Sequence, residues 1–222
     1  MSAIQIVGRR SSLFTRAALI FAEELSLRHE LLPIYDMTTL EPEADAGNPA
    51  LKLLILRRGG AALFGTLNIC RALAEEAGNP ADIVWPEQLH DDVSRNAQEL
   101  VWHCMAAQVQ IIIGTVVGKL PADDVLFVKA RAGLERSLCW LEQNLEVALS
   151  ALPSQRRLSV FEVTLFCLLE HLAWRRTMPT GGYAALAEFV RLFAVRPAAR
   201  GTAYAFDIPP SESNGATITE QS

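Results

Sequence analysis

Hydrophobic positions in the first third of the chain alternate between short apolar runs and a helical spacing. Residues 3–7 and 31–35 form apolar runs that predict two strands. Between them, apolar residues recur at steps of three and four from Leu13 to Leu25, which predicts a helix. Ser11 and Ser12 precede this helix, and either hydroxyl can cap its first turn.

The next segment predicts two more strands and a second amphipathic helix. A polar, acidic stretch at 38–47 is followed by apolar residues 51–56, and the Arg-Arg-Gly-Gly sequence at 57–60 indicates a hairpin turn. A short strand at 61–64 and a helix from 66 to 78 complete the pattern. The predicted order is β-α-β-α-β-β-α, with the first two strands parallel and the last two antiparallel.

After residue 78 the strand pattern stops and long helices follow. Residues 87–117 and 122–152 have apolar positions at steps of three and four, which predicts an antiparallel helical hairpin. Residues 159–174 are more uniformly apolar, which predicts a central helix, capped by Ser159 and Glu162. Two shorter helices are predicted at the end of the chain, at 179–193 and 197–204. The expected division is an α/β domain at 1–78, a linker at 79–88, an all-α domain at 89–207 and a flexible tail at 208–222.

Composition narrows the class of protein. Of the 222 residues, 50% are hydrophobic and the mean hydropathy is +0.20, which favours a globular core over disorder. The formal net charge of −5, without a long basic stretch, argues against nucleic acid as the main partner. The N-terminus lacks the charge order of a secretory signal, and the longest nearly uncharged apolar stretch, read at 109–118, is short of the roughly 20 residues of a spanning helix. We therefore expect a cytoplasmic protein with no membrane partner.

Cysteine and histidine spacing predicts no metal site. The four cysteines are widely spaced, with no C-x-x-C pair, and we expect them to be reduced, buried side chains. The four histidines also lie apart from one another and are expected to be surface residues or satisfied helix residues.

Four segments, in chain order, match the motifs of one known family. Residues 12–22, Ser-Leu-Phe-Thr-Arg-Ala-Ala-Leu-Ile-Phe-Ala, pair a hydroxyl with an Arg four residues later and an apolar helix face. Asn-Pro-Ala-Leu-Lys-Leu at 48–53, Leu-Phe-Gly-Thr-Leu-Asn-Ile at 63–69 and the Ser159–Glu162 cap follow. With this order of lobes, the chain resembles the soluble glutathione transferases. The resemblance implies an α/β thioredoxin-like N-terminal domain (βαβαββα) and an all-α helical-bundle C-terminal domain.

The resemblance also implies a chemistry. A glutathione transferase promotes the thiolate of its co-substrate glutathione with a hydroxyl donor at a helix N-terminus, where the dipole and the hydrogen bond both favour the anion. Ser12 stands at the position of that donor, with Ser11 next to it. The alternative is that one serine only caps the helix. The family further implies a small apolar electrophile as second substrate and a homodimer.

Two departures from the family concern the glutathione site. Leu54 follows Leu53 where the family has a cis-proline that turns the backbone toward glutathione, and we expect a trans bond because a non-proline cis bond costs about 3 kcal/mol. Gly65 replaces a glutamate that would hold the glutamyl amine, whereas Thr66 keeps the hydroxyl for the carboxylate. Two hypotheses follow: a glutathione transferase, or a non-catalytic binding module that has lost glutathione binding.

Arg16 and a group of residues on the first long helix also attract attention. Arg16 is expected to form a buried structural ion pair. Trp102, Met105 and Gln108, with the region near Tyr204, could line a substrate cleft between the lobes or belong to the core.

Overall fold

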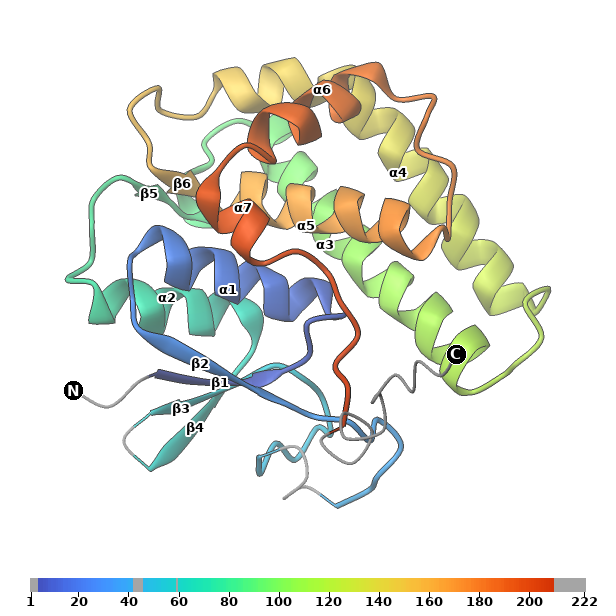
Figure 1. Cartoon of the computed structure of the whole chain (residues 1–222). Helices are drawn as coiled ribbons and strands as arrows, with labels where there is room; N and C mark the ends of the chain where they lie inside the picture. Colours follow the sequence, from blue (N-terminus) through green and yellow to red (C-terminus); the bar gives the residue numbers. More distant parts are fainter. Residues whose placement is uncertain (1–3, 42–45, 59, 210–222) are drawn as a thin grey trace, which may run out of the picture.

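The structure, a computed structural model, describes residues 4–41, 46–58 and 60–209. The chain begins with a four-stranded sheet in the order β2-β1-β3-β4 (Figure 1). Its strands are β1 (Ile4–Gly8), β2 (His29–Pro33), β3 (Ile55–Arg58) and β4 (Ala61–Phe64). β1 and β2 are parallel, and β3 and β4 form an antiparallel hairpin, as the sequence predicted. β3 is also antiparallel to β1, so β4 runs in the direction of β1.

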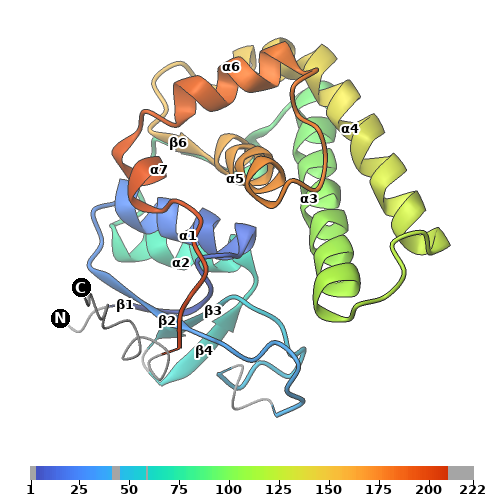
Figure 2. The ribbon, with the colours of Figure 1, turned by 45° about the vertical axis from the view of Figure 1, so that its right-hand side comes forward.

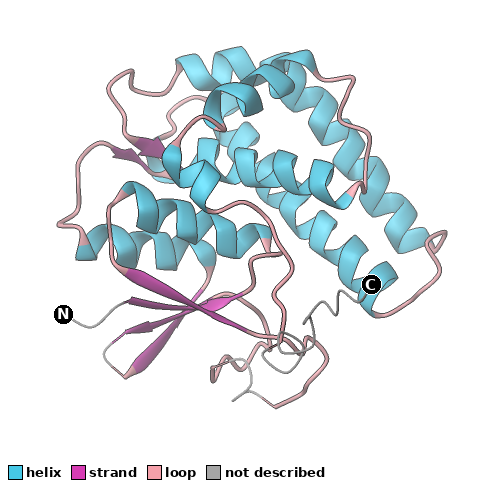
Figure 3. Cartoon of the chain, viewed as in Figure 1, coloured by secondary structure: helices cyan, strands magenta, loops and turns pink. Residues whose placement is uncertain are grey.

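Two helices cover one face of this sheet. They are α1 (Leu13–Glu24) and α2 (Thr66–Glu76), which lie side by side above the strands (Figure 3). The helix predicted between the second and third strands is not found in residues 34–41 and 46–54, which form turns and loops. Gly47 and Pro49 explain this difference, because both residue types disfavour a helix interior. Residues 42–45 lie outside the described part of the chain.

The remaining chain is mostly helical. Its helices are α3 (Asp92–Ile112), which continues into the π-helical turn η3 (Ile113–Val117), α4 (Val125–Ser150), α5 (Val160–Arg175), α6 (Ala184–Phe193) and α7 (Pro197–Gly201). Two short strands that the sequence did not predict, β5 (Ile83–Val84) and β6 (Leu158–Ser159), pair in parallel. They are only two residues long, too short to produce a periodic pattern.

The helical hairpin and the central helix match the sequence with shifted ends. α3 begins at residue 92 and not at 87, because a 3₁₀ turn, η2 (Pro86–Gln88), precedes it and Asp91 caps it by accepting a hydrogen bond from the Ser94 N–H (2.9 Å). α5 contacts α1, α3 and α6 and lies at the centre of the helical part (Figure 2). The Glu162 N–H donates to Ser159 Oγ (3.1 Å), which confirms the predicted cap.

Three of the four cysteines are buried in helices, as the sequence predicted. Cys70, Cys104 and Cys167 are buried, and burial raises the pKa of Cys104 to about 11 and that of Cys167 to about 12. The prediction of a buried side chain was wrong for Cys139, which lies exposed on α4. Among the described residues, no group of three His, Cys, Asp or Glu side chains is placed to hold a metal ion.

One helical stretch, Asp92–Val117, is long and apolar enough to span a membrane by length and composition alone, and 33% of its apolar window is buried within the fold. The apolar stretch is longer than the 109–118 segment predicted from the sequence. In the structure it contacts both α4 and α5. The absence of a membrane partner stays a prediction.

Candidate functional site

Three segments that are distant in sequence meet at one edge of the sheet. The register places Val7 of β1 opposite Ile55 of β3, and Ile55 opposite Phe64 of β4. The loop after β1, the residues before β3 and the turn after β4 therefore lie at the same edge. α1 and α2 both begin there, so two helix N-termini, each carrying a partial positive charge, lie near one another.

The first of these segments is a tight connection between β1 and α1. A Cβ on Gly8 would lie 2.5 Å from Thr15 Oγ1, so only glycine lets the end of β1 approach the first turn of α1 this closely. The Ser12 N–H donates to the carbonyl of Arg9 (3.0 Å), which closes a turn just before the helix. The hydroxyl of Ser12 is thereby fixed at the helix start.

Ser12 is the N-cap of α1. Its Oγ accepts a hydrogen bond from the Thr15 N–H (3.3 Å). A serine hydroxyl has one proton and two acceptor sites, so the cap leaves its O–H available to donate. Within the described residues, that O–H has no acceptor. The capping interpretation is therefore confirmed, and it is compatible with a second role toward a ligand.

Ser11 is placed differently from Ser12. Its side chain is buried, whereas Ser12 is partly exposed. The carbonyl of Ser11 lies 3.2 Å from Nε2 of His171 on α5. Because a carbonyl only accepts, Nε2 carries the proton and Nδ1 accepts from the amide of Gln108 (3.1 Å). Burial, followed by the charges of Arg175 and Arg16, lowers the pKa of His171 to about 4, so the imidazole is neutral at pH 7.

The turn after β4 presents an open helix start. Gly65 is the N-cap of α2 with a φ of +87°, and it provides no side-chain cap for the first-turn N–H groups. Thr66, the first residue of the helix, is partly buried. An N-terminus with unoccupied N–H donors is suited to an anion such as a carboxylate.

The residues before β3 complete the edge. Leu53 is partly buried and Leu54 is 2% exposed. The Leu53–Leu54 peptide bond is cis, so the expectation of a trans bond was wrong. Packing in the fold overrides the local preference here: Leu54 lies in the main core, and Leu53 packs against both that core and the buried cluster on the other face of the sheet.

Arg16 links the sheet edge to the helical part. It is 2% exposed, its Nη2 donates to the Ala199 carbonyl (3.1 Å), and its Nη1 lies 3.8 Å from Glu170 Oε2. Arg16 is therefore buried as predicted, but the ion pair is only half buried, because the side chain of Glu170 is 36% exposed. The guanidinium also lies over the ring of Tyr204, 4.3 Å from its centroid, so it joins α1 to α5, α7 and the segment after α7.

Several solved structures share this arrangement of elements. A glutathione S-transferase from Methylobacillus flagellatus with glutathione bound is 19% identical over 91% of this chain and 100% of its own, with a TM-score of 0.72. One from Methylobacterium radiotolerans, in complex with glutathione sulfonate, is 17% identical over 94% and 98%, with a TM-score of 0.70. A poplar glutathione transferase is 16% identical over 91% and 97%, with a TM-score of 0.67. No protein-family model and no curated protein matches the sequence.

This chain has the glutathione transferase fold. The predicted fold class, a thioredoxin-like α/β part followed by a helical part, is confirmed. In this glutathione transferase fold, Ser12, Leu53, Leu54, Gly65 and Thr66 all fall on the one sheet edge described above, with Ser11 just behind it. Their roles toward a ligand remain predictions.

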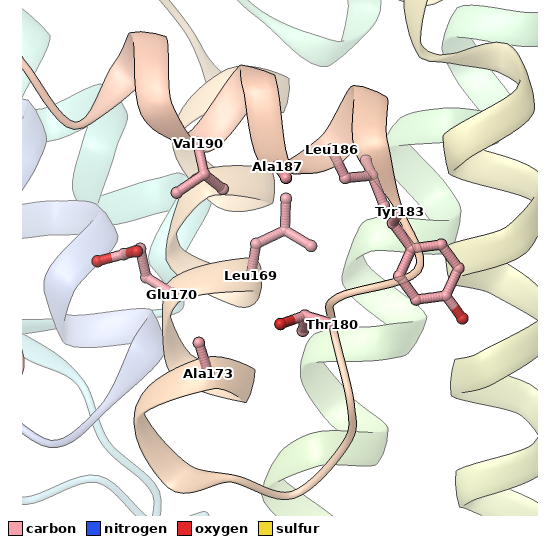
Figure 4. A pocket seen from close by; sticks show the side chains of 8 residues that line it. All are labelled: Leu169, Glu170, Ala173, Thr180, Tyr183, Leu186, Ala187 and Val190. Carbon is pink, nitrogen blue, oxygen red and sulfur yellow. The ribbon is translucent and has the colours of Figure 1, made fainter.

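The residues proposed for the substrate cleft belong mostly to the core of the glutathione transferase fold. Met105 and Gln108 are fully buried, and Gln108 bonds to His171 and Thr177. A cavity of about 170 Å³ lies instead between α5, α6 and the segment joining them (Figure 4). Its lining comprises Leu169, Glu170, Ala173, Thr180, Tyr183, Leu186, Ala187 and Val190, and contains no residue predicted for the site.

Sequence reasoning missed the polar contacts that α5 makes with the sheet edge. His171, Arg175 and Trp174 near the end of α5 lie close to the loop after β1 or to the segment after α7. In the sequence they are single residues in an apolar helix, without a spacing that signals chemistry. His171 is identified by its burial as a polar residue, and Trp174 and Arg175 by their contacts with Phe206, all of which are known only from the structure.

Proposed function

We propose that the protein binds glutathione at the edge of the sheet where α1 and α2 begin, and that the bound thiolate attacks an electrophile. The observation that carries this proposal is the Ser12 hydroxyl. It accepts from Thr15 N–H and keeps its proton free at the start of α1. Two of the solved neighbours, one with glutathione bound and one in complex with glutathione sulfonate, support the same ligand class.

The chemistry follows from the two helix starts. The Ser12 O–H donates to the glutathione sulfur, and the positive end of α1 favours the thiolate, so both lower the thiol pKa. The free N–H groups of α2, with the Thr66 hydroxyl, donate hydrogen bonds to the carboxylate of the glutamyl end. The sulfur then forms a bond to the electrophilic carbon, and the leaving group departs with its electron pair.

The test separates the Ser12 hydroxyl from the Ser12 cap. Glycine is nearly as good an N-cap as serine but has no hydroxyl, whereas threonine keeps both functions. We expect Ser12→Gly to raise the pKa of bound glutathione, measured by ultraviolet titration of the thiolate, and to lower turnover about tenfold or more, since a hydrogen bond to a charged group is worth about 1.5–3 kcal/mol. Ser12→Thr should retain most activity.

Ser11→Ala is the matched control, because Ser11 is adjacent to Ser12 but buried. It should leave the thiol pKa unchanged. An unaltered thiol pKa in Ser12→Gly, at full glutathione occupancy, would refute the role assigned to Ser12.

A second candidate function is a non-catalytic binding module on the same fold. The observation that favours it is Gly65, which offers no carboxylate for the glutamyl amine of glutathione. Gly65→Glu supplies that carboxylate, and Gly65→Ala controls for the change of backbone at a positive φ. If calorimetry detects glutathione binding only in Gly65→Glu, the natural protein is a binding module and not a glutathione enzyme.

We also propose a homodimer. Support comes from the far end of the hairpin between α3 and α4, where Val116, Leu120, Val125 and Leu126 are each more than half exposed. Large apolar side chains gathered at one end of a molecule are typical of an interaction surface. Light scattering at micromolar concentration should give twice the 24.4 kDa of one chain. A single-chain mass would contradict this.

A further inference from the structure

An unusual feature of the sheet edge is a pair of arginines without carboxylate partners in the described part of the chain. Arg9 lies in the loop between β1 and α1, three residues before Ser12, and Arg175 is the last residue of α5. The Nε atoms of both are buried, and neither Nε atom has a hydrogen-bond partner among the described residues. A buried donor left unpaired costs free energy, so this arrangement favours a ligand that supplies an acceptor.

Several contacts hold the two arginines at one place. His171, one turn before Arg175, contacts the carbonyl of Ser11, two residues after Arg9. The segment after α7 runs past the beginning of α1 (Figure 2), and its Asp207 accepts from the Arg10 N–H (2.9 Å). The charge of Arg9 lowers the pKa of Arg175, together with the larger effect of burial, which agrees with their proximity.

An aromatic surface adjoins these charges. The Arg175 guanidinium lies 4.5 Å from the ring centroid of Trp174 and 4.8 Å from that of Phe206. The two rings are 4.8 Å apart, and Phe206 is 62% exposed. The site therefore combines two planar cations with an exposed aromatic ring.

Nearby negative charges do not neutralise the pair. Glu170 lies near Arg16, and the Asp207 carboxylate is bound to a backbone N–H and forms no ion pair among the described residues. Arg9 has one long side-chain hydrogen bond, from Nη1 to the Tyr35 carbonyl (3.4 Å). Arginine matches carboxylates and sulfonates because its planar fork offers two parallel donors.

We propose that Arg9 and Arg175 bind an acidic group of the electrophile, so that the second substrate is an aromatic carboxylate or sulfonate and not a neutral apolar compound. The inference rests on the proposed function. Arg9 holds the acid close to Ser12, and Phe206 contacts the aromatic part. When the acid also carries a halogen on its ring, the glutathione thiolate sulfur forms a bond to the carbon that bears the halogen, and the halide leaves with the electrons of the carbon–halogen bond.

The test compares a chloronitrobenzoate with the corresponding chloronitrobenzamide, which differ in charge but little in shape. Calorimetry without glutathione should show the acid binding about tenfold more tightly than the amide. Arg9→Gln and Arg175→Gln should each abolish most of that preference, and Arg175→Lys should retain part of it. Arg176→Gln, which removes an exposed neighbouring charge, is the matched control and should retain the preference. Thermal unfolding checks that each variant is folded.

The outcomes distinguish this site from the proposed function. Equal binding of acid and amide, or an equal loss in Arg176→Gln, overturns the inference. Competition between glutathione and the acid also overturns it, because the arginines would then belong to the glutathione site. Selective acid binding without any glutathione binding keeps the anion site and refutes the transferase. With glutathione saturating, faster turnover of the benzoate than of the benzamide supports both.

Discussion

The starts of α1 and α2 lie at the same edge of the sheet but are held in opposite ways. α1 has a side-chain cap from Ser12, and His171 contacts the carbonyl just before it. α2 begins at Gly65, which has a positive φ and no capping side chain. The first start offers a ligand a fixed hydroxyl donor, and the second offers free backbone N–H groups. A helix start whose N–H groups have few partners within the protein is the better binding site for an anion.

The titration of His171, beside the α1 start, should have the largest effect on the free energy of unfolding. Burial lowers the pKa of His171 from 6.5 to about 4, so the folded state binds this proton less readily than the unfolded state. The resulting stability is present above about pH 6.5 and is lost as pH falls toward 4. The free energy of unfolding should fall by up to about 3 kcal/mol over this range on account of His171.

His171→Gln isolates this contribution, because its amide can replace the Nε2–H donor to Ser11 without titrating. Urea unfolding of both proteins at several pH values gives the comparison, and other acidic groups affect both proteins alike. The difference in unfolding free energy between wild type and variant should change between pH 6.5 and 4. A constant difference would mean that His171 titrates normally.

At the α2 start, a substitution of Gly65 should lower stability through the backbone conformation and not through a steric clash. A Cβ on Gly65 would meet only Asn68 Nδ2, at 3.6 Å, so there is room for a side chain. Its φ of +87° is nevertheless unfavourable for any residue with a Cβ. We expect Gly65→Ala to lower the free energy of unfolding by about 1–2 kcal/mol, measured by urea unfolding.

Gly60→Ala is the control for Gly65→Ala, because Gly60 also has a positive φ, of +84°, and nothing near its Cβ, but lies at the opposite end of the β3–β4 hairpin. Both variants should lose similar stability, and only the change at Gly65 should weaken glutathione binding. Equal glutathione affinity in the two variants would show that the α2 start is not part of the site.

The α1 start was predictable from sequence because its determinants are local. A serine pair before an apolar helix spacing is sufficient to predict a cap, and Ser159 with Glu162 gave the cap of α5 in the same way. Periodicity also gave the long helices, although their ends shifted where Asp91 and Asp124 capped them. Local sequence patterns thus predicted the type of each element better than the residues at which it begins and ends.

The rest of the site depends on contacts between distant residues. The His171–Ser11 contact joins positions 160 residues apart, and no local pattern signals it. The same holds for Arg175, which meets Phe206 only because the segment after α7 returns to α5. The cis bond at Leu53–Leu54 also contradicted the local preference. Tertiary packing decides these features, and no local pattern in the sequence signals them.

The smallest expected change in stability comes from substitutions of Ser12, which test whether its role as a cap can be separated from its role toward the ligand. Ser12→Ala should lower the free energy of unfolding by about 1 kcal/mol, and Ser12→Gly by only a few tenths, because glycine leaves the N–H groups of α1 open to water. Both variants lack the hydroxyl, so both should lose the same thiol activation. If turnover instead follows stability, with Ser12→Gly nearly as active as wild type, Ser12 is a cap alone. Equal loss of turnover at unequal stability assigns the hydroxyl to the thiol, and the difference between the two starts is then functional.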